Sequence, residues 1–252
     1  MATVAAVATF PDEAGAWLDY LARVTRWTVG ARCAASRVVA VGRFDAATDT
    51  LGAAEIIAGQ AVGGSIGLVL PRPAGAGAPT RFPLPADGDR TLAFLAQRAE
   101  LQRWRPLDAP GALVPEWATE NLDSDVGVAR WFAGLPTDPP ERAQALATAV
   151  RDAGAAERPS AVRAIGDEGL DSAADALQEA AAEDTTKPDV ATLAAVALWL
   201  LGRRPAAIEE FEAIVRRVGD AEFRSFWQVQ RTLDSESPVT LYGPDPDGWS
   251  HS

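Results

Sequence analysis

The sequence predicts an α+β protein that is mostly helical. Short β-branched runs bounded by glycine or proline, which are typical of strands, are concentrated in the first 70 residues. A segment with five prolines and three glycines follows at 71–89, and after it nearly every ordered-looking run has helical spacing. We therefore expect a small α/β unit over 1–88, an antiparallel helical bundle or helical-hairpin repeat region over 89–235, and an irregular tail over 236–252.

The N-terminal unit is predicted to contain one helix and at least two strands. Apolar side chains recur at helical spacing over residues 12–26, which indicates a helix. The runs at 37–44 and 65–70 are short and β-branched, so we expect strands there. The intervening run AAEIIAGQ fits either a strand or a short helix.

The second region is predicted to contain eight helices. The first covers 89–104, where Leu92, Leu95, Ala96 and Ala99 share one face of a helix. Seven further runs are separated by Gly, Pro or Asp, and short connections between helices favour antiparallel packing. These runs are VGVARWFAGL, PERAQALATAVRDAG, PSAVRAIG, LDSAADALQEAAAE, DVATLAAVALWLLG, PAAIEEFEAIVRRVG and DAEFRSFWQVQRTL.

A partial repeat lies within residues 155–220. Ala207 and Phe211 share one helical face, and Ala173 and Leu177 occupy the corresponding positions 34 residues upstream. A small residue followed four positions later by a large apolar one, at this period, resembles the second helix of a tetratricopeptide repeat. The resemblance implies stacked helical hairpins, whereas a generic helical bundle is the alternative.

Side chains that carry most catalysis are scarce in this sequence. The single histidine, His251, is the penultimate residue, where a side chain is seldom held rigidly enough for general base work. The single cysteine, Cys33, cannot form an intrachain disulfide, and we expect it to be a small, half-buried thiol. These observations disfavour an enzyme, and we predict no catalytic residue.

Motifs for cofactors and metal ions are incomplete. The glycine-rich run GQAVGGSIG precedes an expected strand, whereas phosphate-binding loops follow a strand and open a helix. Asn121, Asp123 and Asp125 alternate as in a calcium loop, but the glycine is one residue late and the twelfth position is Phe132. We therefore predict no cofactor and no metal ion, and we expect Asp123 or Asp125 to cap a helix.

Composition excludes several classes of partner. A formal net charge of −12 and a pI near 4.6 disfavour a nucleic-acid binder, because neutralising phosphates requires a basic face. The longest helix-compatible apolar run, VATLAAVALWLLG, is shorter than the roughly 20 apolar residues that span a bilayer. A single cysteine is typical of a reducing compartment. We therefore expect a cytoplasmic protein that binds neither nucleic acid nor membrane.

The charge is unevenly distributed along the chain. Residues 1–115 contain 11 basic and 10 acidic residues, whereas residues 116–252 contain 12 basic and 25 acidic residues. Together with the array-like helices, this asymmetry favours a non-catalytic protein–protein interaction protein, an adaptor or assembly factor. Its acidic helical region would dock on a basic protein partner or support self-association.

Arginines in the N-terminal half suggest alternatives. Arg32, Arg37 and Arg43 would hold an anionic ligand if they converged in a pocket between the strands and the first helix, which would make the protein an enzyme or a small-ligand binder. A third hypothesis is a structural subunit of a larger assembly. A separate candidate contact for a partner or an anion consists of Arg103, Trp104 and Arg105. Each arginine can donate two parallel hydrogen bonds to an anion, and the tryptophan offers a large apolar surface to a partner.

Overall fold

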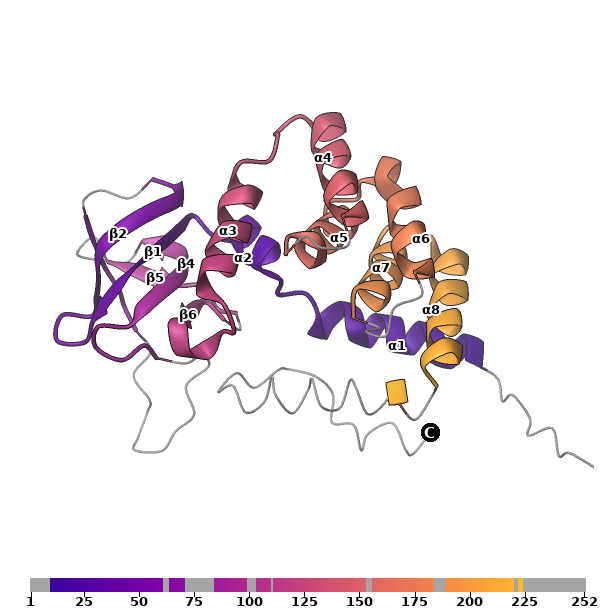
Figure 1. Cartoon of the computed structure of the whole chain (residues 1–252), viewed down its shortest axis with the longest axis horizontal. Coiled ribbons are helices and arrows are strands. Elements are labelled where there is room, and N and C mark those ends of the chain that lie inside the picture. The colour runs from indigo at the N-terminus through magenta and orange to yellow at the C-terminus, as the bar shows by residue number, and fades with distance from the viewer. Residues whose placement is uncertain are drawn as a thin grey trace, which may run out of the picture.

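The structure is a computed structural model that describes residues 10–60, 64–70, 84–98, 103–109, 111–152, 156–183, 189–219 and 222–223. These residues form a curled antiparallel sheet and eight α-helices, with the sheet at one end of the molecule (Figure 1). The predicted fold class, α+β and mostly helical with most helices following the sheet, is confirmed.

The sheet has six strands in the order β3-β2-β1-β4-β5, and β6 pairs with β4. Strand β1 lies at the centre, and its first five residues are buried, as expected for a strand covered on both faces. An isolated parallel bridge between Leu68 and Trp104 joins the two ends of this order, so the sheet curls back on itself. The strands are β1 (Val38–Asp45), β2 (Thr50–Gly59), β3 (Ser65–Gly67), β4 (Arg90–Arg98), β5 (Trp104–Pro106) and β6 (Leu113–Pro115).

Glycines permit the tight pairing of β1 with β2. A Cβ atom on Gly42 would lie 2.8 Å from the carbonyl oxygen of Gly52. Gly59 has a φ of +83°, and a Cβ atom there would lie 2.0 Å from the carbonyl oxygen of Arg37. The register between the two strands shifts twice, and such bulges bend and twist a strand. These features explain how the sheet curls.

The helices begin and end at residues that satisfy free backbone groups. The side chain of Asn121 accepts a hydrogen bond at the start of α3, and Asp138 does the same for α4. Gly169 and Gly202, both at positive φ, follow α5 and α7. The helices are α1 (Phe10–Val24), α2 (Val29–Ala35), α3 (Leu122–Ala133), α4 (Pro139–Arg151), α5 (Arg158–Asp167), α6 (Ala174–Ala182), α7 (Asp189–Leu200) and α8 (Arg204–Val218).

Helix α7 is the centre of the helical part. It contacts α1, α5, α6 and α8, and this agrees with its sequence, which is apolar around its whole circumference. Helix α1 comes from the start of the chain but packs along α7 and α8 (Figure 1). Its buried residues Ala14, Leu18 and Leu21 belong to the same core as the residues of α4 to α8. The N-terminal helix therefore completes the helical part and does not cover the sheet.

Two hydrophobic cores meet at α2 and α3. Leu122, Val126 and Ala129 of α3 pack into the core of the sheet, whereas Phe132, at the end of the same helix, packs into the helical core. Helix α2 contacts α3, α5 and β4. These two short helices thus join the sheet to the helices.

The predicted helix over 89–104 is wrong, because most of this segment forms β4 and the start of β5. Residues 91–95 are all buried, since β4 is paired on both edges, by β1 on one side and by β5 and β6 on the other. A strand buried on both faces has no alternating pattern and is hard to distinguish from a helix. The boundary expected at residue 88 consequently falls inside the sheet. The ambiguous run AAEIIAGQ lies in β2 apart from its last residue.

The four positions that carry the repeat resemblance, Ala173, Leu177, Ala207 and Phe211, are all buried in the helical core. Membership of the tetratricopeptide family stays a prediction. Of the last predicted helix, DAEFRSFWQVQRTL, only Glu222 and Phe223 are described, and the tail over 236–252 lies outside the described residues.

Candidate interaction surface

The structure does not bring together the three arginines predicted to hold an anion. Arg32 lies on α2, with its Cζ atom 5.5 Å from the centroid of the Phe94 ring. Arg37, directly before β1, and Arg43, within β1, are exposed and lie six residues apart, which corresponds to about 20 Å of extended chain. Because α1 packs on α7 and α8, the pocket expected between this helix and the strands is not formed by the described residues.

Two of the three residues in the second candidate contact, Arg103 and Trp104, already contact other parts of the chain. Nη2 of Arg103 donates to the carbonyl oxygens of Thr48 and Asp49, at 2.8 and 3.3 Å. Trp104 is half-buried against the core of the sheet. Arg105 is exposed and forms no ion pair within the described part of the chain. Arg103 therefore ties β5 to the β1–β2 turn, and the segment does not present two free guanidinium groups.

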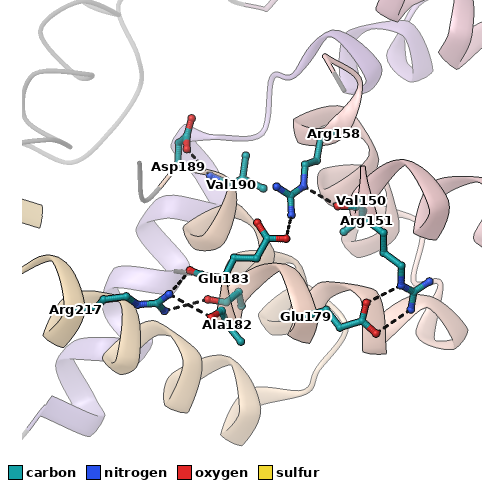
Figure 2. Close-up of polar contacts among 10 residues, drawn as sticks. Val150, Arg151, Arg158, Glu179, Ala182, Glu183, Asp189, Val190 and Arg217 are labelled. Carbon is teal, nitrogen blue, oxygen red and sulfur yellow. Dashed lines mark hydrogen bonds and ion pairs between the residues drawn. The ribbon is translucent and has the colours of Figure 1, made fainter. Parts of the chain in front are cut away.

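Arginines also clamp the helices to one another, as Figure 2 shows around the end of α6. Arg151 of α4 forms a two-pronged ion pair with Glu179 of α6, at 2.6 and 3.2 Å. Arg158 of α5 is buried and binds Glu183 and a backbone carbonyl. Arg217 of α8 donates to the last backbone carbonyls of α6, where a cation is favoured by the helix dipole.

Two more arginines extend the same pattern. Arg142 of α4 binds both carboxylate oxygens of Glu168, at 2.6 and 2.7 Å, and Arg203 binds both oxygens of Asp171, at 2.7 and 2.8 Å. Hydrogen bonds from the arginines lower the pKa of Asp171 and of Glu179. Several carboxylates of the acidic region are thus paired with arginines within the molecule.

Helix α8 is an exception to this pattern. Glu209, Glu210 and Glu212 lie near its middle, and within the described residues none of their carboxylates forms a hydrogen bond or an ion pair. Burial, and then the charge of Glu209, raise the pKa of Glu210, and Arg217 opposes this shift only in part. These three carboxylates are therefore not neutralised by a direct contact within the described residues, although α8 also contains Arg204, Arg216 and Arg217.

An exposed tryptophan is the most prominent apolar feature of the described surface. Trp117 lies in a short 3-10 helix (Glu116–Ala118) directly after β6, and it is 61% exposed. Its indole Nε1 donates a hydrogen bond to Oδ2 of Asp89, 2.9 Å away. The other exposed large hydrophobic among the described residues is Leu200, at 37%. Trp117 is thus presented to solvent in a fixed orientation.

The support of Trp117 is itself held in place. The same oxygen of Asp89 accepts a hydrogen bond from the backbone N–H of Ala86, at 2.6 Å. The neighbouring Arg90 pairs with Asp123 of α3, at 2.6 Å. We define the Trp117 surface as Trp117, its partner Asp89, and the charged residues that are close to these two in the chain or bonded to their chain neighbours: Arg43, Asp87, Arg90, Glu116, Glu120 and Asp123.

The sequence offered one signal for this surface, which the prediction of candidate contacts missed. Trp117 stands in the run VPEWATEN, between two glutamates, and the residues that follow it up to Asn121 are small or polar. A tryptophan directly followed by small and polar residues is less typical of a core than one inside an apolar run. Its bond to Asp89, 28 residues away, was not visible in the sequence.

The remaining candidates have structural roles. Burial raises the pKa of Cys33 to about 12, against a smaller opposing effect of Arg32, so the thiol is protonated and unreactive at neutral pH. The predicted cap at Asp123 or Asp125 is wrong, because Asn121 caps α3, while Asp125 accepts from the Thr119 hydroxyl. Among the described residues, no group of three or more His, Cys, Asp or Glu is placed to hold a metal ion. Each described helix is too short or too polar to span a bilayer.

No protein-family model matches this sequence, and no curated protein or solved structure is significantly similar to it. The function is therefore inferred from the residues and contacts described above.

Proposed function

We propose that this chain is a non-catalytic protein that binds another protein through the Trp117 surface. The observation that carries this proposal is that Trp117 is 61% exposed while its indole N–H is fixed by Asp89. Burying a large aromatic ring is a strong source of binding energy, and tryptophan is enriched among the residues that dominate protein interfaces. A ring that is already held in one orientation loses little entropy when it is buried by a partner.

The position of Trp117 supports this role. It follows β6, whose residues are buried, and it lies next to the ion pair of Arg90 with Asp123, which joins β4 to α3. The surface is thus built on elements that belong to the core of the sheet, and rigid elements present a binding residue more precisely than a free loop does. The single cysteine favours a reducing compartment, and we place this interaction in the cytoplasm.

A second candidate surface is the acidic face of α8, which would dock on a basic partner. It is favoured by Glu209, Glu210 and Glu212, which have no cation partner within the described residues. A cation supplied by a partner would relieve the unfavourable environment of the Glu210 carboxylate. The two surfaces lie on different parts of the molecule and are separable by mutation.

The test is capture of partners from a native extract on the immobilised full-length chain, with mass spectrometric identification. We expect at least one protein that is retained by the wild type and by the Leu200→Ala variant but lost with Trp117→Ala. Leu200 is the matched control, since it is the other exposed large hydrophobic among the described residues. Equal retention of every protein by Trp117→Ala and wild type would exclude the Trp117 surface. Loss confined to a Glu209→Gln, Glu210→Gln, Glu212→Gln variant would assign binding to α8.

A further inference from the structure

The charges around Trp117 are mostly negative. The Trp117 surface contains five carboxylates and two arginines. The side chain of Asp123 remains 77% exposed although it forms an ion pair with Arg90. The carboxylates are Asp87, Asp89, Glu116, Glu120 and Asp123, and the arginines are Arg43 and Arg90. A ligand that covers the ring must therefore face an excess of negative charge.

Both arginines of this surface are engaged within the molecule. Arg90 pairs with Asp123, and Nη1 of Arg43 donates to the carbonyl oxygen of Gly88 at 3.1 Å. Glu116 and Glu120, which flank Trp117 in the chain, are exposed and form no hydrogen bond or ion pair among the described residues. The negative charge next to the ring is thus only partly balanced from within.

The face of an indole ring attracts cations, because its π electrons give it a negative potential. The hydrogen bond from the Trp117 N–H to the Asp89 carboxylate polarises the indole in the same direction. The ring and the carboxylates therefore favour the same class of ligand.

We propose that the Trp117 surface binds an arginine- or lysine-bearing segment of a partner protein, with one cationic side chain over the ring and others at Glu116 and Glu120. This inference rests on the proposed function and adds the chemistry of the partner. An acidic segment or a nucleic acid is disfavoured, because its anionic groups would face the same carboxylates.

The experiment titrates the ¹⁵N-labelled full-length protein with a blocked octapeptide of alternating glycine and arginine and follows the indole N–H signals by NMR. The Trp117 signal is assigned by its absence in Trp117→Phe. We expect the arginine peptide to shift this signal, and the matched glycine–glutamine peptide to leave it unchanged. Raising the salt from 50 to 300 mM should weaken binding several-fold, because the carboxylates are exposed.

Variants separate the ring from the charges. Trp117→Ala should weaken binding of the arginine peptide about tenfold or more. Glu116→Gln with Glu120→Gln should weaken it about three- to tenfold while leaving the ring in place. Asp89→Asn keeps an oxygen that accepts from the indole N–H but removes a charge, so it should weaken binding without releasing the ring.

Three outcomes would overturn the inference. The first is no shift with the arginine peptide, and the second is an equal shift with the glutamine peptide. The third is a wild-type dimer, measured by light scattering, that Trp117→Ala converts to a monomer, since the occupant would then be a second copy of the chain. If the arginine peptide does not bind while capture of a protein still requires Trp117, the proposed function is supported and the inference that the partner is cationic is rejected. If both fail, the proposed function falls with it.

Discussion

The hydroxyl of Ser160 on α5 accepts a hydrogen bond from the backbone N–H of Gly30 on α2, at 3.1 Å, in the buried junction between the sheet and the helices. The first N–H groups of a helix have no partner within the helix. The side chain of Thr28 satisfies the N–H of Ala31, and Ser160 satisfies the N–H of Gly30. A residue 130 positions away thus completes the start of α2.

We predict that Gly30→Ala destabilises the protein. A Cβ atom at this position would lie 2.7 Å from the Phe132 ring and 2.9 Å from Cβ of Ser160, so α2 must move away from both helices. We expect a loss of about 1–3 kcal/mol in the free energy of unfolding. Urea denaturation followed by circular dichroism measures it.

The control for this variant is Gly127→Ala. Gly127 lies within α3, where a Cβ atom would meet nothing within 4 Å, so the change should stabilise α3 by about 0.5–1 kcal/mol. A Gly30→Ala protein as stable as the wild type would show that the junction is looser than the contacts indicate.

Gly59→Ala is predicted to disrupt the pairing of β1 with β2. It combines a positive φ with a Cβ atom 2.0 Å from the carbonyl oxygen of Arg37, and we expect a loss of about 3 kcal/mol or more. Gly88 has nearly the same φ, +82°, but open space around it, so Gly88→Ala should cost about 1 kcal/mol. Both variants carry the strain of a positive φ, and only Gly59→Ala adds a steric clash. The difference between their losses of stability in thermal unfolding therefore measures the clash. Equal losses would mean that the strands shift to accommodate the extra atom.

Helices α1 and α3 to α8 were predictable from sequence because amphipathic spacing, proline at helix starts and glycine after helix ends act locally, whereas the short helix α2 was not predicted. Strand β4 was not, because its residues are buried on both faces and carry no period of two. The placement of α1 against α7 and α8 was equally hidden. Leu18 and Leu21 indicate a helix with an apolar face, but nothing in them specifies which distant surface that face covers.

The candidate site was less predictable than the fold. Arg32, Arg37 and Arg43 are close in sequence, yet an extended strand separates the last two and helix packing directs the first toward Phe94. Trp117 is held in its orientation by Asp89, which is distant in sequence and approaches it through the pairing of β4 with β6. Charge asymmetry was visible in the sequence, but which carboxylates are paired with arginines was not.

Arg158 is predicted to stabilise the packing of the helices more than the exposed Arg151 does. Its side chain is only 6% exposed, and it donates to Glu183 and, at 2.6 Å, to the carbonyl oxygen of Val150. Arg158→Leu leaves both acceptors without their donor, and we expect a loss of about 2–3 kcal/mol in chemical denaturation. Arg151→Leu removes a similar pair with Glu179 at an exposed position, and it should cost about 1 kcal/mol or less. Similar losses of stability for the two variants would show that burial does not make the contacts of Arg158 more stabilising than those of Arg151.

The pH dependence of stability tests the environment of the Glu210 carboxylate on α8. Burial and Glu209 raise the pKa of Glu210 above its ordinary value of 4.5, so the folded state binds this proton more tightly than the unfolded state does. The contribution of Glu210 to stability is therefore complete below the unfolded pKa and is lost as the pH rises through the folded pKa. We expect Glu210→Gln to be more stable than the wild type at pH 7 by a few tenths of a kcal/mol and equal to it near pH 4. The exposed Glu141→Gln on α4, measured in parallel by thermal unfolding, controls for the general loss of a negative charge. If Glu210→Gln is instead less stable at pH 7, the carboxylate has a favourable partner in the folded chain, and α8 loses its support as a second docking surface.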